Sequence, residues 1–279
     1  MSTTLRNEFF GPYKLIRELG QAHGASRFIV LCSRTDTNYV LYRFASTPSH
    51  SERRAKFNHL LKLTTLDHSH ILALQSVTYD DHGRLCVITP YTGNHDGLVS
   101  LDDLVAQRSG KIGIIESARA IEHLLGASKY AHSRNLYHGT IDQSDILIDR
   151  YGCLQIQLYG YQPNSQSREQ SPVQQTMTAA DEVRSIVQTG YYMLTGLRSS
   201  ADRIPPSRVI KKLDKAWDTW FEIGLDPIDG FENIDHAINA LPTNPSCHKW
   251  LTRNASVRPQ VHIGSMLRRF RTPASQTTR

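Results

Sequence analysis

The sequence of 279 residues predicts an α+β fold with two lobes: a small antiparallel β-sheet lobe with one main helix, then a larger, mainly helical lobe. Two observations support this fold class. Short apolar stretches at hairpin spacing fill the first 90 residues, whereas amphipathic helical stretches dominate from residue 91 to residue 242. We therefore expect lobes at 1–90 and 91–242 and a basic tail at 243–279.

The first lobe is expected to contain five strands and one helix. Runs of β-branched and aromatic residues, separated by Gly20 and by a turn at 35–38, open the chain. Ser51 is the expected cap of a helix that runs to about residue 66, with Phe57 and Leu60 on its apolar side. The strands are expected at 13–19, 27–32, 39–45, 71–77 and 85–89.

The second lobe is expected to contain helices around a central hairpin at 137–160. In this hairpin, strands at 146–148 and 154–158 flank a turn that ends at Gly152. Apolar residues at helical spacing predict the surrounding helices. These helices are expected at 101–106, 114–131, 180–194, 207–215, 217–225 and 233–241.

Charge and cysteine content narrow the function classes. The four cysteines form no CxxC pair, which favours neither a disulfide framework nor a thiolate zinc site and suggests a reducing, cytoplasmic location. No apolar run is long enough to span a membrane. Residues 243–279 carry seven cations and no acid, so the rest of the chain carries 6 minus 7, or −1. A solvated tail is favoured over a tether to nucleic acid or an anionic membrane surface.

Nine short motifs follow one another between residues 12 and 242. They are GQAHGAS, VLYR, LDHSHIL, VITPY, HGTIDQSDIL, LYG, SPV, EVRSIVQTGYYMLTG and DPIDGF. Their order and spacing resemble the protein kinase-like superfamily, in particular bacterial-type serine/threonine kinases. In that family the corresponding segments are the Gly-rich loop, the VAIK strand, the turn after the first helix, the hinge, the HRD catalytic loop, DFG, APE, a buried helix and a DPxxRF segment.

The resemblance places unsuitable side chains at the positions that carry phosphoryl transfer. The catalytic base position is Thr140, whose neutral hydroxyl cannot accept the substrate proton, and loss of a base costs about 10²–10⁴ in rate. The metal-binding DFG aspartate falls on Leu158, which offers no oxygen ligand. The loop asparagine is Asp145, which could hold one metal ion only if the protein is active. Asp142 could act as a displaced base, although capping of its own loop is favoured.

The resemblance also implies a damaged nucleotide cleft. Of the phosphate-loop glycines Gly20 remains, but two become Ala22 and Ala25, and the phosphate-holding lysine becomes Arg43. The usual glutamate partner of that lysine falls on His59, so the activating ion pair is absent in its usual form.

Two further positions are expected to narrow the adenine site, since Arg27 and Leu41 replace smaller residues there. Salt-bridging or plugging of the cleft is favoured for Arg27 over replacement of the lost lysine. The hinge still offers the carbonyl of Thr89 and the N–H of Tyr91 to an adenine edge.

The packing positions of the family persist. His138, Tyr159, Leu63 and Leu74 match the four residues that form the apolar spine between the lobes, and Glu182 matches the acid that anchors this spine. His68 and His70 form an HxH pair in a turn, and a turn role is favoured over a metal site because no third ligand is near in sequence.

These observations predict a pseudokinase that lacks phosphoryl transfer and acts as a binding or scaffolding module for a protein partner, either another kinase or a signalling protein. No cofactor is required, although ATP could bind without or with weakly bound Mg²⁺. One alternative is an atypical serine/threonine kinase that uses ATP, one metal ion and Asp142 or Asp145. A second alternative makes the basic tail the functional part, as a tether.

Overall fold

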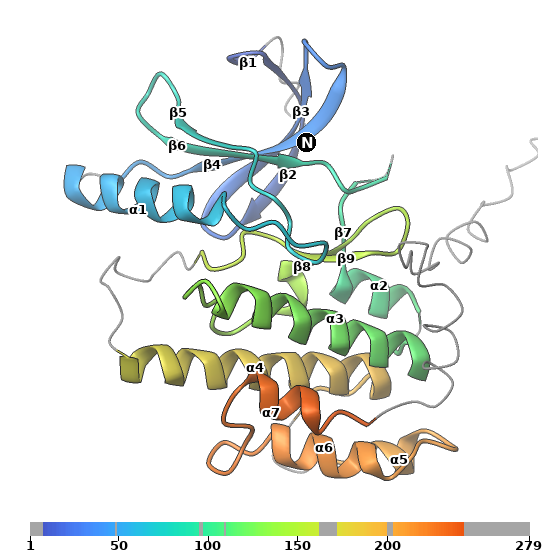
Figure 1. Cartoon of the computed structure of the whole chain (residues 1–279). Helices are drawn as coiled ribbons and strands as arrows, with labels where there is room; N and C mark the ends of the chain where they lie inside the picture. The colour runs from blue at the N-terminus through green and yellow to red at the C-terminus, as the bar shows by residue number, and fades with distance from the viewer. Residues whose placement is uncertain are drawn as a thin grey trace, which may run out of the picture.

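The first lobe is a curved, fully antiparallel sheet with one helix, as a computed structural model of the chain shows (Figure 1). The structure describes residues 8–242, apart from 48, 95–96, 109, 162–171 and 200–202. The sheet has the strand order β1-β2-β3-β4-β6-β5. Its elements are β1 (Phe9–Phe10), β2 (Tyr13–Ala22), β3 (Ala25–Cys32), β4 (Thr37–Phe44), α1 (His50–Leu63), β5 (Ser76–Tyr79) and β6 (Leu85–Pro90).

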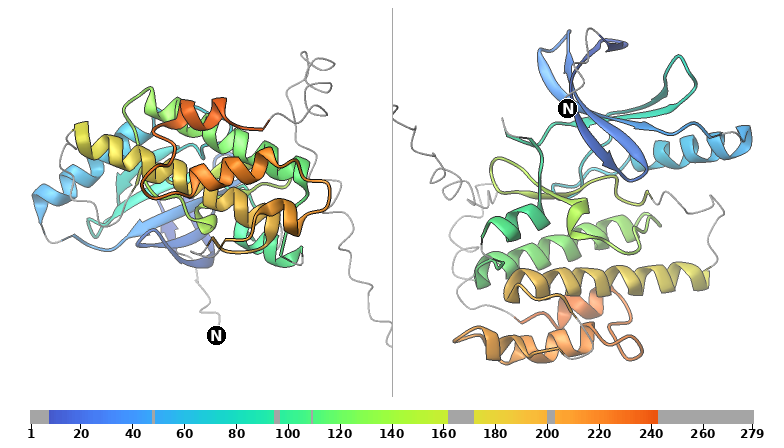
Figure 2. Two further views of the ribbon diagram at one scale, coloured as in Figure 1. Left: turned by 90° about the horizontal axis from the view of Figure 1, so that it is seen from below. Right: turned by 180° about the vertical axis from the view of Figure 1, so that it is seen from behind.

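The second lobe stacks helices below a small three-stranded sheet. Figure 1 shows α3 above α4, with α5 and α6 at the far end, and Figure 2 shows the β2–β3 hairpin reaching down toward this lobe from behind. The elements are β7 (Val99–Ser100), α2 (Leu101–Gln107), α3 (Ile114–His132), the 3₁₀ helix η1 (Gln143–Asp145), β8 (Ile146–Ile148), β9 (Leu154–Ile156), α4 (Pro172–Thr195), α5 (Pro206–Val209), α6 (Ala216–Gly224) and α7 (Ile234–Asn239).

The two-lobed α+β prediction is confirmed, but several boundaries in the first lobe were wrong. The strand expected at 71–77 lies at Ser76–Tyr79, because the apolar residues before it are buried in an irregular segment whose Ile71 forms an isolated bridge with Ile156. The sheet gains a sixth strand, β1. Helix α1 is capped by Ser49, whose hydroxyl accepts from the Glu52 backbone N–H, and not by Ser51.

The sequence predicted that the first strand ends at Gly20, but the chain does not turn there. Strand β2 continues to Ala22 through a β-bulge between Glu18 and Gly20. Gly20 has a φ of 80°, which a glycine adopts readily at such a bulge. The turn lies at His23 and Gly24, whose φ values of 53° and 72° are the pair that a tight two-residue hairpin requires. His23 therefore stands at the tip of the hairpin.

Two helices of the second lobe also differ from expectation. Helix α4 begins at Pro172, eight residues earlier than predicted, while the helix expected at 207–215 is only the short α5. In the segment after α5, Lys212 has a φ of 69°, which a helix excludes, and Leu213 is buried. No helix among the described residues is both long and apolar enough to cross a membrane. The basic tail at 243–279 lies outside the described residues.

The sheet separates two apolar clusters. The larger cluster spans both lobes and contains Val40, Tyr42 and Phe44 of β4. The smaller cluster covers the outer face of the sheet and contains Leu41 and Phe28. Because successive residues of a strand point to opposite faces, this division fixes which residues of β4 face the cleft between the lobes.

Candidate functional site

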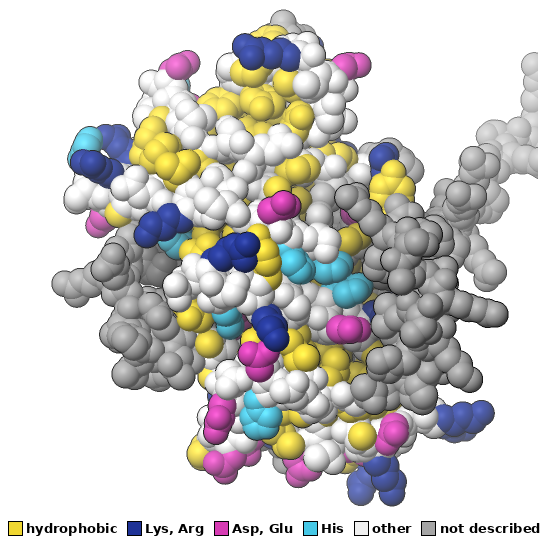
Figure 3. Space-filling model, viewed as in Figure 1, with side chains coloured by type: hydrophobic (Ala, Val, Ile, Leu, Met, Phe, Trp, Pro, Cys, Tyr) yellow, Lys and Arg dark blue, Asp and Glu magenta, His cyan; other side chains and the backbone are white. Residues whose placement is uncertain are grey.

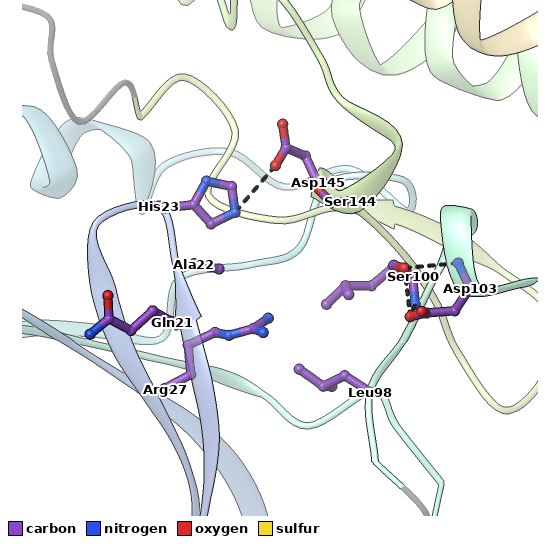
Figure 4. A pocket seen from close by; sticks show the side chains of 10 residues that line it. Gln21, Ala22, His23, Arg27, Leu98, Ser100, Asp103, Ser144 and Asp145 are labelled. Atoms are coloured by element: carbon purple, nitrogen blue, oxygen red, sulfur yellow. Dashed lines mark hydrogen bonds and ion pairs between the residues drawn. The ribbon is translucent and has the colours of Figure 1, made fainter. Parts of the chain in front are cut away.

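A cavity of about 290 Å³ lies in the cleft where the β2–β3 hairpin faces the second lobe (Figure 4). It is the position at which the sequence predicted a nucleotide site. Three elements surround it: the hairpin from above, the segment from Leu98 to α2, and the loop containing η1. The lining residues are Gln21, Ala22, His23, Arg27, Leu98, Ser100, Asp103, Ser144, Asp145 and Leu147.

The hairpin tip closes on the expected metal position. His23 Nε2 lies 3.5 Å from Asp145 Oδ1, and the two side chains are only 8% and 17% exposed. Burial lowers the pKa of His23, although the Asp145 carboxylate opposes this shift. The other carboxylate oxygen of Asp145 accepts the backbone N–H of Asp142 at 3.0 Å. Both oxygens of Asp145 are therefore engaged within the protein.

The loop that carries the expected base is organised by its own acids. The carboxylate of Asp142 accepts the backbone N–H of Ser144 at 3.0 Å and caps η1, which confirms the capping interpretation of this residue. Thr140 is exposed beside it. The Asp142 carboxylate, which could have replaced the base, thus serves as a cap that stabilises the loop.

Tyr42, and not Arg43, is the β4 residue that faces the cleft next to the predicted phosphate site. Its hydroxyl donates to Gln157 Oε1 at 2.8 Å, and Gln157 Nε2 donates to the carbonyl of Ser144 at 2.8 Å. Both Tyr42 and Gln157 are buried. Sequence matching had missed this bond because both faces of β4 are apolar, so the inward register could not be read from the pattern.

Arg43 and Leu41 lie on the outer face of the sheet, which corrects the expectation that they face a nucleotide. Arg43 Nη1 lies 2.9 Å from Glu8 Oε1 and its Nε lies 3.7 Å from Asp80 Oδ2. Its guanidinium also lies over the ring of Phe28. Leu41 packs in the outer cluster. The cation therefore ties the strands together on the side away from the cavity.

Replacing Tyr42 with phenylalanine should lower the free energy of unfolding by about 1–3 kcal/mol, since it leaves Gln157 Oε1 buried without a donor. Urea denaturation of both proteins measures the change. Tyr39→Phe is the matched control, because Tyr39 belongs to the same strand but packs at the outer face; its effect should stay within about 0.5 kcal/mol. Equal effects of the two substitutions would show that the Tyr42 bond contributes nothing specific.

In the hinge, the backbone carbonyl of Thr89 is not available to an adenine edge, although the sequence suggested that it would be. The Ile88 carbonyl accepts from the Gln75 N–H on one edge of β6, so the next residue, Thr89, directs its backbone groups to the other edge, where Val40 of β4 is its partner. Thr89 is fully buried. Its carbonyl faces β4 and not an adenine site. Tyr91 follows the strand, half-buried, and its hydroxyl donates to the Asn94 carbonyl.

The remaining vestigial positions are spread along the hairpin. Ala22 pairs with Ala25 across the tip, where Ala25 is buried in the main core and Ala22 lines the cavity. Gly20 is exposed at the bulge and does not line the cavity. Of the expected cofactor residues, the structure therefore brings Ala22 to the cavity, with Arg27 beside it.

The DFG-like segment is buried at Leu158 and is hydrogen-bonded to α1 at Gly160. Leu158 is buried with a φ of 45°, a strained value for a leucine. His59 Nε2–H donates to the Gly160 carbonyl at 2.8 Å. This bond was not predicted from the sequence, and it links α1 directly to the segment after β9.

The four residues of the predicted spine are all buried. Leu63, Leu74 and Tyr159 belong to the main core, and the ring of His138 meets that of Tyr159 edge to face with centroids 5.2 Å apart. The ring contact lies within the second lobe, and the shared core, which contains Leu63 and Leu74 of the first lobe and Tyr159 of the second, connects the two lobes.

Glu182 anchors the spine from α4. It is fully buried, and its Oε2 accepts the backbone N–H groups of His138 at 2.7 Å and Gly139 at 3.2 Å. Its Oε1 accepts the hydroxyl of Tyr159, and His132 Nε2 lies 3.2 Å from Oε2. Burial alone would raise the pKa of this carboxyl, but the contact with His132 and the charge of His138 hold the pKa below its usual value.

Comparison with known proteins supports the fold assignment. No family model matches the sequence. CBL-interacting protein kinase 9 of Oryza sativa subsp. japonica is 24% identical over 159 residues, which cover 54% of this chain and 32% of that protein. The chain thus matches only about a third of the length of this curated relative.

Solved structures match over a larger part of the chain. One structure of the PknI kinase domain of Mycobacterium tuberculosis has a TM-score of 0.63 at 19% identity and covers 84% of this chain and 97% of that domain. A second has a TM-score of 0.64 at 18% identity and covers 84% and 96%. The two lobes, the buried spine and these matches together show that this chain has the protein-kinase-like fold.

Proposed function

We propose that this protein is a pseudokinase, a kinase-like protein without phosphotransfer that binds or scaffolds a protein partner, either another kinase or a signalling protein. The contact between His23 and Asp145 is the observation that carries the proposal. It places an imidazole against the one remaining carboxylate at a metal position. A divalent ion there would have to displace the imidazole.

The side chains around this contact support the same conclusion. Phosphoryl transfer needs positioned cations and a base, but Leu158 and Thr140 supply neither. On β4, the neutral phenol of Tyr42 faces the cleft where a cation is required, and burial raises its pKa to about 12. If a base and a metal ligand each lower the barrier by about 3–5 kcal/mol, losing both leaves little activity even when their effects are not additive.

Three side-chain contacts between protein groups join the lobes, which suits a binding module. His23 meets Asp145, Tyr42 bonds to Gln157, and His59 bonds to the Gly160 carbonyl. Each contact joins the first lobe to the second, and none requires nucleotide, metal or another cofactor.

A phosphate-transfer assay tests this proposal. The purified chain, incubated with γ-labelled ATP and Mg²⁺ or Mn²⁺, should label neither itself nor a general protein substrate above the level of a blank. An active bacterial kinase domain serves as the positive control, and Asp145→Ala serves as the specificity control. Metal-dependent labelling that disappears in Asp145→Ala would overturn the proposal and establish the alternative of an atypical kinase with one metal ion.

A further inference from the structure

Arg27 places a cation in the cavity without a carboxylate partner. It extends from β3 toward the cavity, on the side where Leu98 and Ser100 lie (Figure 4). No acidic side chain in the described part of the chain lies within ion-pair distance of it. Its Nη2 donates a long hydrogen bond of 3.4 Å to the Leu19 carbonyl. Its Nε is buried and has no acceptor.

The acids that line the same cavity are already engaged. One oxygen of Asp103 accepts the backbone N–H of Ser100 at 3.0 Å and the hydroxyl of Ser100 at 2.6 Å. Asp145 is paired with His23 and caps the loop beside it. Neither carboxylate compensates the guanidinium. Arg27 is partly buried and its guanidinium interacts with the Tyr42 hydroxyl, but its buried Nε–H has no acceptor, and a buried N–H without an acceptor costs about 1–3 kcal/mol.

Arg43 shows what a compensated arginine looks like in the same sheet. It belongs to the neighbouring strand, one register position from Arg27, but it points to the opposite face. There it meets Glu8, Asp80 and the ring of Phe28. The Nε of Arg43 also lacks a hydrogen-bond acceptor, so the two arginines differ in their carboxylates: Arg43 has two as ion-pair partners, whereas Arg27 has none among the described residues.

We infer that the cavity binds a small ligand through an anionic oxygen, either a carboxylate or a phosphate, which pairs with the Arg27 guanidinium. A planar guanidinium binds such groups through two parallel N–H donors. Leu98 and Leu147 provide apolar walls for the remainder of the ligand. The volume of about 290 Å³ is at the small end of ligand pockets, which fits a compact molecule. The inference rests on the proposed function, since a cleft that turned over ATP would be filled by nucleotide.

Thermal unfolding of the full chain in the absence of nucleotide and metal tests the inference. The probes are inorganic phosphate and malonate, each compared with chloride at equal ionic strength, so that the two sources of anionic oxygen are separated. At about ten times its Kd, a bound probe should raise the Tm by about 3–6 °C. Arg27→Gln should weaken the affinity roughly tenfold or more, whereas Arg43→Gln should leave the affinity unchanged.

The outcomes separate this inference from the proposed function. A Tm increase with either anion that is lost in Arg27→Gln and kept in Arg43→Gln supports the site and identifies the preferred group. No shift with either anion, or the same shift in all three proteins, overturns it. Phosphate transfer is measured in a separate assay, so the failure of one proposal does not imply the failure of the other.

Discussion

Replacing Glu182 with alanine should lower the free energy of unfolding by about 3–5 kcal/mol, the largest single effect that we expect in this protein. The carboxylate is fully buried and is the common acceptor for two backbone N–H groups and the Tyr159 hydroxyl. Alanine leaves these donors, and His132 beside them, without their shared acceptor. Removing one member of a buried charged network costs several kcal/mol because the remaining groups stay desolvated.

Urea denaturation at neutral pH measures this effect, and Glu222→Ala is the matched control. Glu222 is an exposed acid on α6, and its loss should change stability by less than about 0.5 kcal/mol. In a chain of this size, a loss of 3–5 kcal/mol lowers the Tm by roughly 6–20 °C. If Glu182→Ala were as stable as Glu222→Ala, the network would not anchor the spine.

Much of the fold could be predicted from the sequence because its signals are local. Hairpin spacing and helical periodicity defined both lobes, and the motif order placed His138, Tyr159 and Glu182 where the structure has them. These residues are buried, and few other side chains could replace them in their surroundings, so their positions could be recognised from the motifs. The wrong predictions for the fold concerned where strands and helices begin and end. At β5 and α5, neighbouring apolar residues are buried in irregular segments and had been assigned to the strand or the helix.

The site itself was less predictable because its contacts are made between distant segments. A one-residue error in the inward register of β4 exchanged Arg43 for Tyr42, and only the paired sheet reveals which of them faces the cleft. The contacts of His23 with Asp145 and of His59 with Gly160 join segments about 100 residues apart. No sequence motif describes either contact. A comparison that looks only for lost catalytic residues does not find the residues that now make contacts in their place.

The protein should also lose stability steeply between pH 6.5 and pH 4, because a group of stacked histidines is neutral when the chain is folded. Histidine side chains gather on the face of the molecule shown in Figure 3. The rings of His70 and His123 stack with centroids 4.0 Å apart, and the ring of His68 lies 5.6 Å from that of His70. His70 and His68 follow α1, whereas His123 belongs to α3, so the group joins two distant segments.

Burial is the main reason that these rings are neutral in the folded chain. His70 Nδ1 donates to the Leu154 carbonyl at 2.9 Å, and His68 Nδ1 accepts the backbone N–H of His70 at 3.2 Å. Burial lowers the pKa of all three rings, and for His123 the nearby His70 and Arg119 add to the effect, bringing its pKa to about 4. Asp67 opposes the shift at His68, and the hydrogen bond to the Leu154 carbonyl opposes the shift at His70. The thiol of Cys153 lies 3.7 Å from His70 Nδ1, and burial raises the pKa of this thiol to about 11, which keeps it neutral.

The sign of the effect follows from proton binding. An unfolded histidine binds its proton near pH 6.5, whereas folded His123 does so only near pH 4. In this window the unfolded chain binds more protons, so the free energy of unfolding decreases as the pH falls. His123 alone accounts for about 3 kcal/mol by pH 4, and His68 and His70 act in the same direction. Above pH 6.5 the three rings are neutral in both the folded and the unfolded chain, so they do not make the free energy of unfolding depend on pH.

Urea denaturation across this range should therefore give a steep pH dependence for the natural chain and a shallower one for His123→Phe, which keeps an aromatic ring against His70 but cannot bind a proton. His50→Phe is the matched control, since His50 is exposed at the start of α1. Its pH dependence should follow that of the natural chain. If His123→Phe kept the full slope, the acid sensitivity would have to come from groups outside the stack, and the contact between the segment after α1 and helix α3 would not depend on neutral histidines.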